Sequence, residues 1–288
     1  MRASLPRPVE VELILQPLFV FVKSVWYNSH QHEPVGYRVV VLYTLVGLVV
    51  GVLLNHAADH LPQRRSILRP IHCPSCGANG GWRDAVSLVG LLLSHGRCVQ
   101  CGARYPLRRP LLELVTALAF GFFWIRYGPS VQLAFITLYC CLLFLIFVID
   151  LERRLILQVV IYPAILLAIV GSHFYPGLGL RRAVLGGITA FLFFYLVMVV
   201  GKLAFKRTAM GRGDVNLAAF VGLIVGFPEI ILALVIAISL GGLVAFALLL
   251  CRVKKLRSYI PYGVFLAVAG VTVLVFGEEI IGWYFGLY

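Results

Sequence analysis

The sequence predicts an all-α polytopic membrane protein with about eight transmembrane helices and a small four-cysteine insertion between the first and second spans. Of its 288 residues, 61% are hydrophobic and only 13% are charged, and the mean hydropathy is +0.95. Soluble domains are only about 45–50% apolar, so this composition indicates a lipid environment. Apolar runs that approach the roughly 20 residues of a membrane span recur along the chain. One long polar stretch interrupts them and contains two CxxC motifs.

The amino-terminal residues 1–36 mix charges and prolines with a moderately apolar stretch that Pro17 and Lys23 interrupt. We interpret this part as an interfacial helix followed by a linker. A cleavable signal is not expected, because an apolar core followed by a small-residue cleavage site is missing. The first transmembrane helix is predicted at 37–54 and would itself direct insertion.

Residues 55–109 form the polar stretch, which is too long for a simple connection and predicts a separate small domain. After Pro110 the sequence is almost continuously apolar. The region 110–288 is therefore the main transmembrane domain. Its spans are expected near 110–126, 130–150, 155–171, 183–203, 214–228, 229–251 and 260–285.

The basic residues predict the orientation, because Lys and Arg are enriched in cytoplasmic loops. With the amino terminus outside and the cysteine-containing domain inside, 18 of the 25 Lys and Arg residues fall on the inside. The seven on the outside are Arg2, Arg7, Lys23, Arg38, Arg126, Arg181 and Arg182. The net charge of +13 thus reflects topology, and we expect anionic lipid rather than nucleic acid beside the inner loops.

Two aspartates stand at the ends of apolar runs. Asp150 closes one run, and Asp214 opens another directly after Gly211-Arg212-Gly213. Ionisable residues at such positions are functional candidates, because a charge inside a membrane is costly. In the eight-span topology both lie near the cytoplasmic face, so they can be neighbours in space. Gly211 and Gly213 carry no side chains, which would let an extended substrate backbone approach Asp214.

Two adjacent aspartates can share one proton, so that one activates a water and the other donates to a scissile carbonyl oxygen. Structural roles are the alternative: Asp214 as the N-cap residue of a helix, and Asp150 as the ion-pair partner of Arg153 or Arg154. A proton-coupled transporter also uses intramembrane carboxylates. It would hold them near the bilayer midplane, so their depth separates the two classes.

The four cysteines of the polar domain are Cys73 and Cys76, then Cys98 and Cys101, with 21 residues between the pairs. This spacing is typical of a tetrahedral structural Zn²⁺ site. Four cysteine ligands leave no open coordination position, so the metal would support folding or docking. Disulfides, the alternative, require an oxidising space, and a redox CxxC needs only one pair.

Other polar residues near this domain have weaker interpretations. Asn55, His56, Asp59 and His60 are either metal ligands or, as we expect, the solvated end of the first helix. Glu113 is either a buried partner of an arginine or an acid at the membrane interface.

Several motifs in order resemble those of one known family, the type IV prepilin peptidases, GxGD-type membrane aspartic peptidases also called prepilin leader peptidases/N-methyltransferases. The matching motifs are Asn55 before Leu61-Pro62, the paired CxxC, Arg104-Tyr105-Pro106 before Glu113, Ile149-Asp150-Leu151-Glu152, Met210-Gly211-Arg212-Gly213-Asp214 and Ile260-Pro261-Tyr262-Gly263. The resemblance extends over nearly the whole chain from about Gly47.

The resemblance implies removal of the short basic leader from type IV prepilins or pseudopilins, which carry a transmembrane helix, at the cytoplasmic border of the inner membrane. Asp150 and Asp214 would be the catalytic pair of an aspartic peptidase domain over 110–288. The four cysteines would be the zinc ligands of the domain over 55–109. The alternative function is a non-catalytic zinc-bearing membrane scaffold of a pilus or secretion system.

Many family members also methylate the new terminal amine with S-adenosylmethionine, an activity associated with the amino-terminal domain. In this chain, residues 56–60 and the stretch Asp84-Ala85-Val86 depart from the usual pattern of that domain. S-adenosylmethionine is therefore an expected cofactor only if the methyltransferase activity is retained.

Overall fold

The computed structural model describes residues 36–63, 76, 86–94, 97, 100–104, 106–205, 211–251 and 261–284. The predicted interfacial segment lies outside these residues, except for Gly36. The described helices are α2 (Tyr37–His60), the short 3₁₀ helix η1 (Leu61–Gln63), α4 (Ser87–Ser94), α5 (Arg108–Tyr127), α6 (Val131–Arg153), α7 (Gln158–Phe174), α8 (Gly179–Phe205), α9 (Arg212–Val225), α10 (Glu229–Leu250) and α11 (Tyr262–Tyr284). The all-α prediction is confirmed for this part of the chain.

Each predicted span coincides with one helix, but the helices differ in length. Six of those described, namely α2, α5, α6, α8, α10 and α11, are long and apolar enough to cross a membrane. The helices α7 and α9 have only 17 and 14 residues. At about 1.5 Å per residue, α9 is roughly 21 Å long, against a hydrocarbon core of about 30 Å. The structure therefore supports a multi-pass protein with six candidate spans and two shorter helices.

The outer surface of the helices is apolar, as a lipid-embedded protein requires. Large side chains such as Leu42, Leu166, Leu203 and Leu243 are exposed on α2, α7, α8 and α10. Soluble monomers rarely expose contiguous apolar faces of this size. These faces suit contact with lipid tails.

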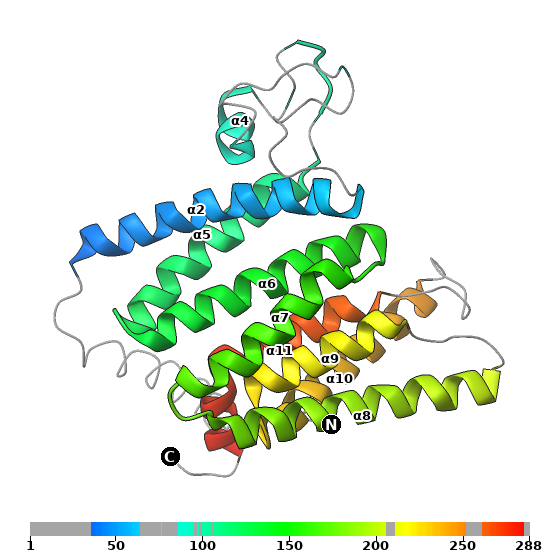
Figure 1. Ribbon diagram of the computed structural model, residues 1–288. Coiled ribbons are helices and arrows are strands. Elements are labelled where there is room, and N and C mark those ends of the chain that lie inside the picture. The colour runs from blue at the N-terminus through cyan, green and yellow to red at the C-terminus, as the bar shows by residue number, and fades with distance from the viewer. Residues whose placement is uncertain are drawn as a thin grey trace, which may run out of the picture.

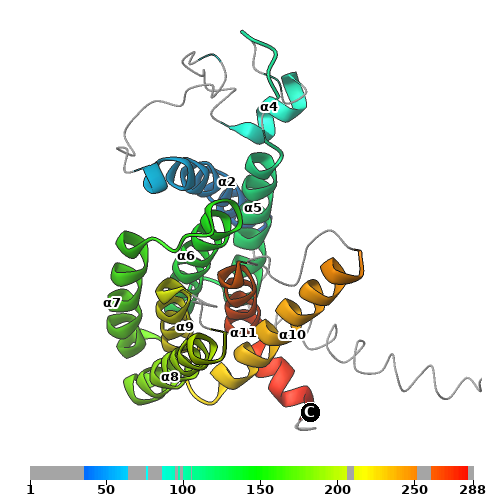
Figure 2. The same cartoon turned by 90° about the vertical axis from the view of Figure 1, so that its right-hand side faces the viewer.

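Helix α9 occupies the middle of the main bundle, which we define as α6 to α11. It packs against α7, α8, α10 and α11, and Figures 1 and 2 show it enclosed among them. Helices α8 and α9 cross at Gly186 and Gly222, where a Cβ on Gly222 would lie 2.3 Å from the Gly186 carbonyl oxygen. The two glycines therefore allow backbone contact between these helices.

Helices α2, α4 and α5 form a second group, which we call the N-terminal unit. The helices α2 and α5 pack along each other, and α4 stands off the bundle beside their ends (Figures 1 and 2). Helix α2 continues to His60, past its predicted end at residue 54. The polar insertion accordingly follows Gln63 and ends where α5 begins at Arg108.

Candidate active site

The structure brings Asp150 and Asp214 together. Asp150 lies three residues before the end of α6, and Asp214 is the third residue of α9. Both are buried, with 2% and 3% exposure, and the two carboxyl groups interact electrostatically. The prediction that residues distant in the sequence lie at the same end of the bundle is confirmed for this pair.

The start of α11 holds Asp150. The backbone amide of Val264 donates to Oδ2 of Asp150 at 3.2 Å. Val264 is the third residue of α11, where backbone amides have no acceptor within their own helix. Asp150 itself lies at the carboxyl end of α6, which disfavours negative charge. The amino end of α11 offsets this, because helix amino termini stabilise anions.

Asp214 is held by its own helix. Its Oδ2 accepts a hydrogen bond of 3.1 Å from the backbone amide of Gly211, the N-cap residue of α9. An acid at the third helical position commonly binds the N-cap amide in this way. Asp214 is therefore not the N-cap residue of the alternative interpretation, because Gly211 holds that position. Its side chain still binds a backbone amide at the start of α9, and this bond coexists with the pairing to Asp150.

Gly263 is a site residue that the sequence reasoning did not assign. Its amide faces both carboxyl groups. A Cβ at this position would lie 2.7 Å from Oδ2 of Asp150 and 3.1 Å from Cδ1 of Ile156. Only the motif Pro261-Tyr262-Gly263, quoted for the resemblance, pointed to this stretch. The close approach of α11 to Asp150 therefore depends on a glycine.

The two glycines next to Arg212 have different surroundings. A Cβ at Gly211 would lie 3.4 Å from Oδ2 of Asp214, so this glycine borders the carboxylate. A Cβ at Gly213 would instead lie 2.8 Å from Cβ of Ile156. Gly213 thus allows close packing of the segment after α6 against the start of α9.

The arginines that follow Asp150 do not neutralise it by direct contact. Within the described residues, neither Arg153 nor Arg154 forms an ion pair with Asp150. Arg154 adopts a left-handed conformation with φ 53°, and its amide donates to the Asp150 carbonyl at 2.9 Å. It ends α6 through its backbone, so the ion-pair alternative for Asp150 is not observed.

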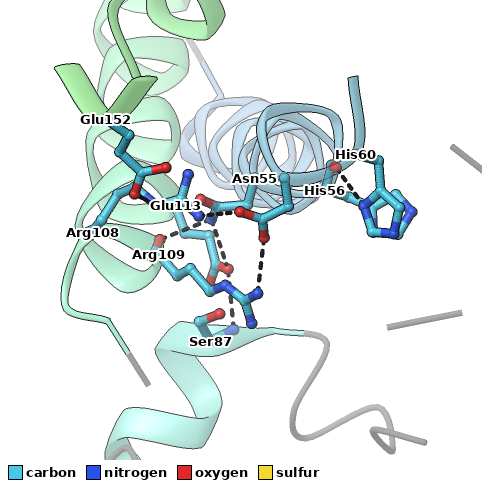
Figure 3. Close-up of polar contacts among 9 residues, drawn as sticks. Asn55, His56, His60, Ser87, Arg108, Arg109, Glu113 and Glu152 are labelled. Atoms are coloured by element: carbon cyan, nitrogen blue, oxygen red, sulfur yellow. Dashed lines mark hydrogen bonds and ion pairs between the residues drawn. The ribbon is translucent and has the colours of Figure 1, made fainter. Parts of the chain in front are cut away.

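A second polar cluster joins the helices of the N-terminal unit (Figure 3). Glu113 is completely buried and accepts hydrogen bonds from the amides of Ser87 and Leu88 at 3.1 and 2.7 Å. Asn55 donates to Glu113 at 3.3 Å and to the Arg109 carbonyl at 2.9 Å. The interpretation of Glu113 as an interfacial acid was wrong, because the side chain is completely buried. Its observed partners are two backbone amides of α4 and the side chain of Asn55. Glu113 caps the amino terminus of α4.

Asp59 lies beside this cluster and binds two arginines of α5. Its carboxylate oxygens are 2.5 Å from Nη2 of Arg108 and 2.8 Å from Nη2 of Arg109. The His56 and His60 rings lie against each other on the same helix end, with centroids 4.0 Å apart and ring planes tilted by 34°. The polar end of α2 predicted from the sequence is confirmed as helical. It is partly buried against α5 rather than simply solvated.

The predicted zinc ligands are only partly described. Cys76 and Cys101 are exposed, whereas Cys73 and Cys98 lie outside the described residues. No group of three or more His, Cys, Asp or Glu side chains with metal-binding geometry occurs in the portion the structure describes. Four thiolates in two CxxC turns suit Zn²⁺ chemically, and the zinc site stays a prediction.

The fold and site together define a multi-pass helical membrane protein with a buried pair of aspartates at helix ends. Residues 137–246 match the type IV leader peptidase family, and residues 45–127 match the bacterial peptidase A24 N-terminal domain. The chain belongs to the type IV leader peptidase family.

Several relatives carry the name prepilin leader peptidase/N-methyltransferase. The protein from Vibrio cholerae is 30% identical over 202 residues, which cover 66% of this chain and 79% of the relative. The one from Pseudomonas aeruginosa is 27% identical over 82% of this chain and 90% of its own length. The protein from Bacillus subtilis is 27% identical over 83% of this chain and 95% of its own length. No solved structure matches the chain significantly.

Proposed function

We propose that this protein is a membrane-embedded aspartic endopeptidase that removes the short basic leader from type IV prepilins or pseudopilins. The observation that carries this proposal is the pairing of buried Asp150 with buried Asp214. The family and the names of the relatives support the substrate class. With the orientation expected from the basic residues, cleavage takes place at the cytoplasmic border of the inner membrane.

The geometry suggests how the pair would act. Each Oδ2 is bound by a backbone amide, that of Val264 for Asp150 and that of Gly211 for Asp214. In this proposal the Oδ1 atoms hold a water and the shared proton. The ionised aspartate takes a proton from the water while the water oxygen bonds to the scissile carbonyl carbon. The protonated aspartate donates its proton to the carbonyl oxygen. Collapse of this intermediate breaks the C–N bond and protonates the leaving amine.

The surroundings of the pair also bear on substrate approach. Gly211 leaves one side of Asp214 without a side chain, where an extended backbone can lie. The exposed apolar faces of the spans leave room in the bilayer for the transmembrane helix of a prepilin. Anionic lipid beside the inner basic loops would complete the environment of the leader.

The test is cleavage of a model prepilin in membranes by the native chain, by Asp150→Asn and by Asp214→Asn. Each substitution is expected to lower the rate by at least about 100-fold, since acid–base catalysis contributes about 10²–10⁴. Glu278→Gln, which changes an exposed carboxylate of α11, serves as the control and keeps full activity. Full cleavage by either Asp→Asn variant would refute the aspartic mechanism. Intact pilus function in both variants, with loss in cysteine variants, would favour the scaffold alternative.

A second activity, methylation of the new terminal amine, is favoured by one observation. Residues 45–127 match the N-terminal domain, and the relatives are named N-methyltransferases as well as peptidases. S-adenosylmethionine would supply the methyl group. Mass spectrometry of the cleaved product with and without S-adenosylmethionine tests this, because methylation adds the mass of one methyl group. An unmethylated product from an actively cleaving chain would exclude the activity.

A further inference from the structure

Helix α5 carries an arginine near each end, and each arginine pairs with a glutamate of the main bundle. Nε of Arg108 lies 2.9 Å from Oε1 of Glu152 on α6. At the other end of the helix, Arg126 pairs with Glu279 on α11. At about 1.5 Å per residue, the two arginines are roughly 27 Å apart along α5. The N-terminal unit is thus joined to the main bundle by ion pairs at both ends of one helix.

The ion pair of Arg108 with Glu152 is part of a bridge between three helices (Figure 3). The Arg108 guanidinium donates a hydrogen bond from Nη2 to Asp59 of α2 at 2.5 Å. Its Nε forms an ion pair with Glu152 of α6 at 2.9 Å, without the alignment of a hydrogen bond. The Arg108 side chain is only 14% exposed. Arginine can hold two carboxylates in a fixed arrangement, whereas a lysine ammonium is a point charge without this fork. The Arg108 charge therefore joins the end of α6 to α2 and α5, although the Glu152 side chain is 34% exposed.

That end of α6 carries the candidate active site. Glu152 is two residues after Asp150, in the same last turn. The chain then turns at Arg154, and Ile156 packs against both Gly213 and Gly263. A shift of the α6 terminus would consequently move Asp150 and also the side chain that packs against α9 and α11.

We propose that Arg108 is a positioning residue for proteolysis, which holds the end of α6 so that Asp150 faces Asp214. This proposal rests on the peptidase function proposed above. It makes the N-terminal unit a working part of the peptidase, because Asp59 on α2 and Arg108 on α5 act on Asp150 through Glu152.

The experiment measures kcat and KM for a model prepilin with the full-length chain in membranes, together with the thermal unfolding temperature in detergent. Arg108→Gln and Glu152→Gln are each expected to lower kcat by about tenfold with little change in KM, because small displacements of catalytic groups reduce rates strongly. The double variant should lose no more than either single variant, since both remove the same ion pair. Arg108→Lys should recover only part of kcat.

Two matched controls separate positioning from general stability. Arg109→Gln removes a contact to Asp59 but leaves the bridge from Arg108 to Glu152, so kcat should stay near the native value. Arg126→Gln breaks the ion pair with Glu279, which is more buried than the pair of Arg108 with Glu152. This variant should lower the unfolding temperature without a specific loss of kcat. If Arg108→Gln does not accumulate, Glu152→Gln decides, because it leaves the Asp59 contact intact.

An unchanged kcat in Glu152→Gln would overturn the role of Arg108. So would a kcat loss in the double variant that equals the product of the two single-variant losses. Equal kcat losses in Arg126→Gln would do so too, since they would indicate a general effect of stability. These results are independent of the peptidase assignment, which the Asp150→Asn variant tests by itself. A native chain that cleaves and an inactive Asp150→Asn variant would leave the proposed function standing in every case.

Discussion

The Val264 amide and the Asp150 carboxylate, 114 positions apart in the sequence, are joined by a hydrogen bond of 3.2 Å. This bond sets the start of α11 against the end of α6, beside the start of α9. A charge near a helix amino terminus is stabilised by about 0.3–1 kcal/mol, and by up to about 2 kcal/mol when partly buried. Asp150 is stabilised in this way by the amino terminus of α11, and Asp214 by that of α9. Two buried carboxylates are thus accommodated by two helix amino termini.

The glycine at position 263 is expected to be essential for cleavage. In Gly263→Ala the new Cβ would lie 2.7 Å from Oδ2 of Asp150, so α11 or the carboxylate must move. Displacements of this order in an active site can reduce activity by about 100-fold. We expect such a loss in kcat/KM, measured with a model prepilin in membranes.

The matched control for this prediction is Gly270→Ala on the same helix. The three atoms nearest to its Cβ would be side-chain methyl groups, two of Val221 at 3.2 Å and one of Leu143 at 3.4 Å. It should cleave at close to the native rate. Native activity in Gly263→Ala would mean that the close approach of α11 to Asp150 is dispensable.

The sequence predicted the two aspartates and the positions of the eight helices, because apolar runs and charges at their ends are local features. It did not predict the roles of Gly263 and Val264. Their contact with Asp150 is made by backbone amides across a long sequence separation, and a backbone amide has no residue-specific signature. The same reason explains Glu113, whose partners are mainly the amides of α4. The bounds of the span predicted at 214–228 were also shifted, since α9 begins two residues earlier, at Arg212, and ends three residues earlier, at Val225, although the apolar run continues.

Glu113 is expected to hold α4 against α2 and α5. Its removal in Glu113→Ala leaves the amides of Ser87 and Leu88 and the side chain of Asn55 without their acceptor. Hydrogen bonds to a charged group are worth about 1.5–3 kcal/mol. We expect the free energy of unfolding to fall by about 2–4 kcal/mol, and the Ser87 and Leu88 amides to exchange hydrogen faster.

Hydrogen exchange and limited proteolysis of the insertion measure this effect. Glu278→Gln is the control, because it alters an exposed carboxylate of α11, outside the N-terminal unit. Unchanged exchange at Ser87 and Leu88 in Glu113→Ala would contradict the capping role.

The crossing of α8 and α9 should tolerate no side chain at its closest point. In Gly222→Ala the Cβ would lie 2.3 Å from the backbone oxygen of Gly186, which cannot rotate away as a side chain can. Overpacking of this kind typically costs about 1–3 kcal/mol. We expect a lower unfolding temperature in detergent. Gly242→Ala on α10, where no atom lies within 4 Å, should leave that temperature unchanged or raise it, because alanine favours helices. Equal unfolding temperatures for the two variants would show that the two helices can separate at little cost.

The four cysteines are expected to bind one zinc ion per chain. Cys76→Ser and Cys101→Ser each remove a thiolate from the predicted set with Cys73 and Cys98, so zinc content measured on the purified chain should fall to the background. Cys251→Ser changes an exposed cysteine outside the two CxxC motifs and should retain the metal.

The alternative chemistry of these thiols has a distinct signature. Disulfides would protect the four cysteines from alkylation until a reductant is added, whereas zinc thiolates become reactive when a chelator removes the metal. Because four-cysteine zinc has no open coordination position, its loss should expose the insertion to proteases while the native aspartate pair continues to cleave. If the cysteines are alkylated only after a reductant is added, and the native chain contains no zinc, the four cysteines form disulfides rather than a metal site. That result would also contradict a cytoplasmic location of the insertion.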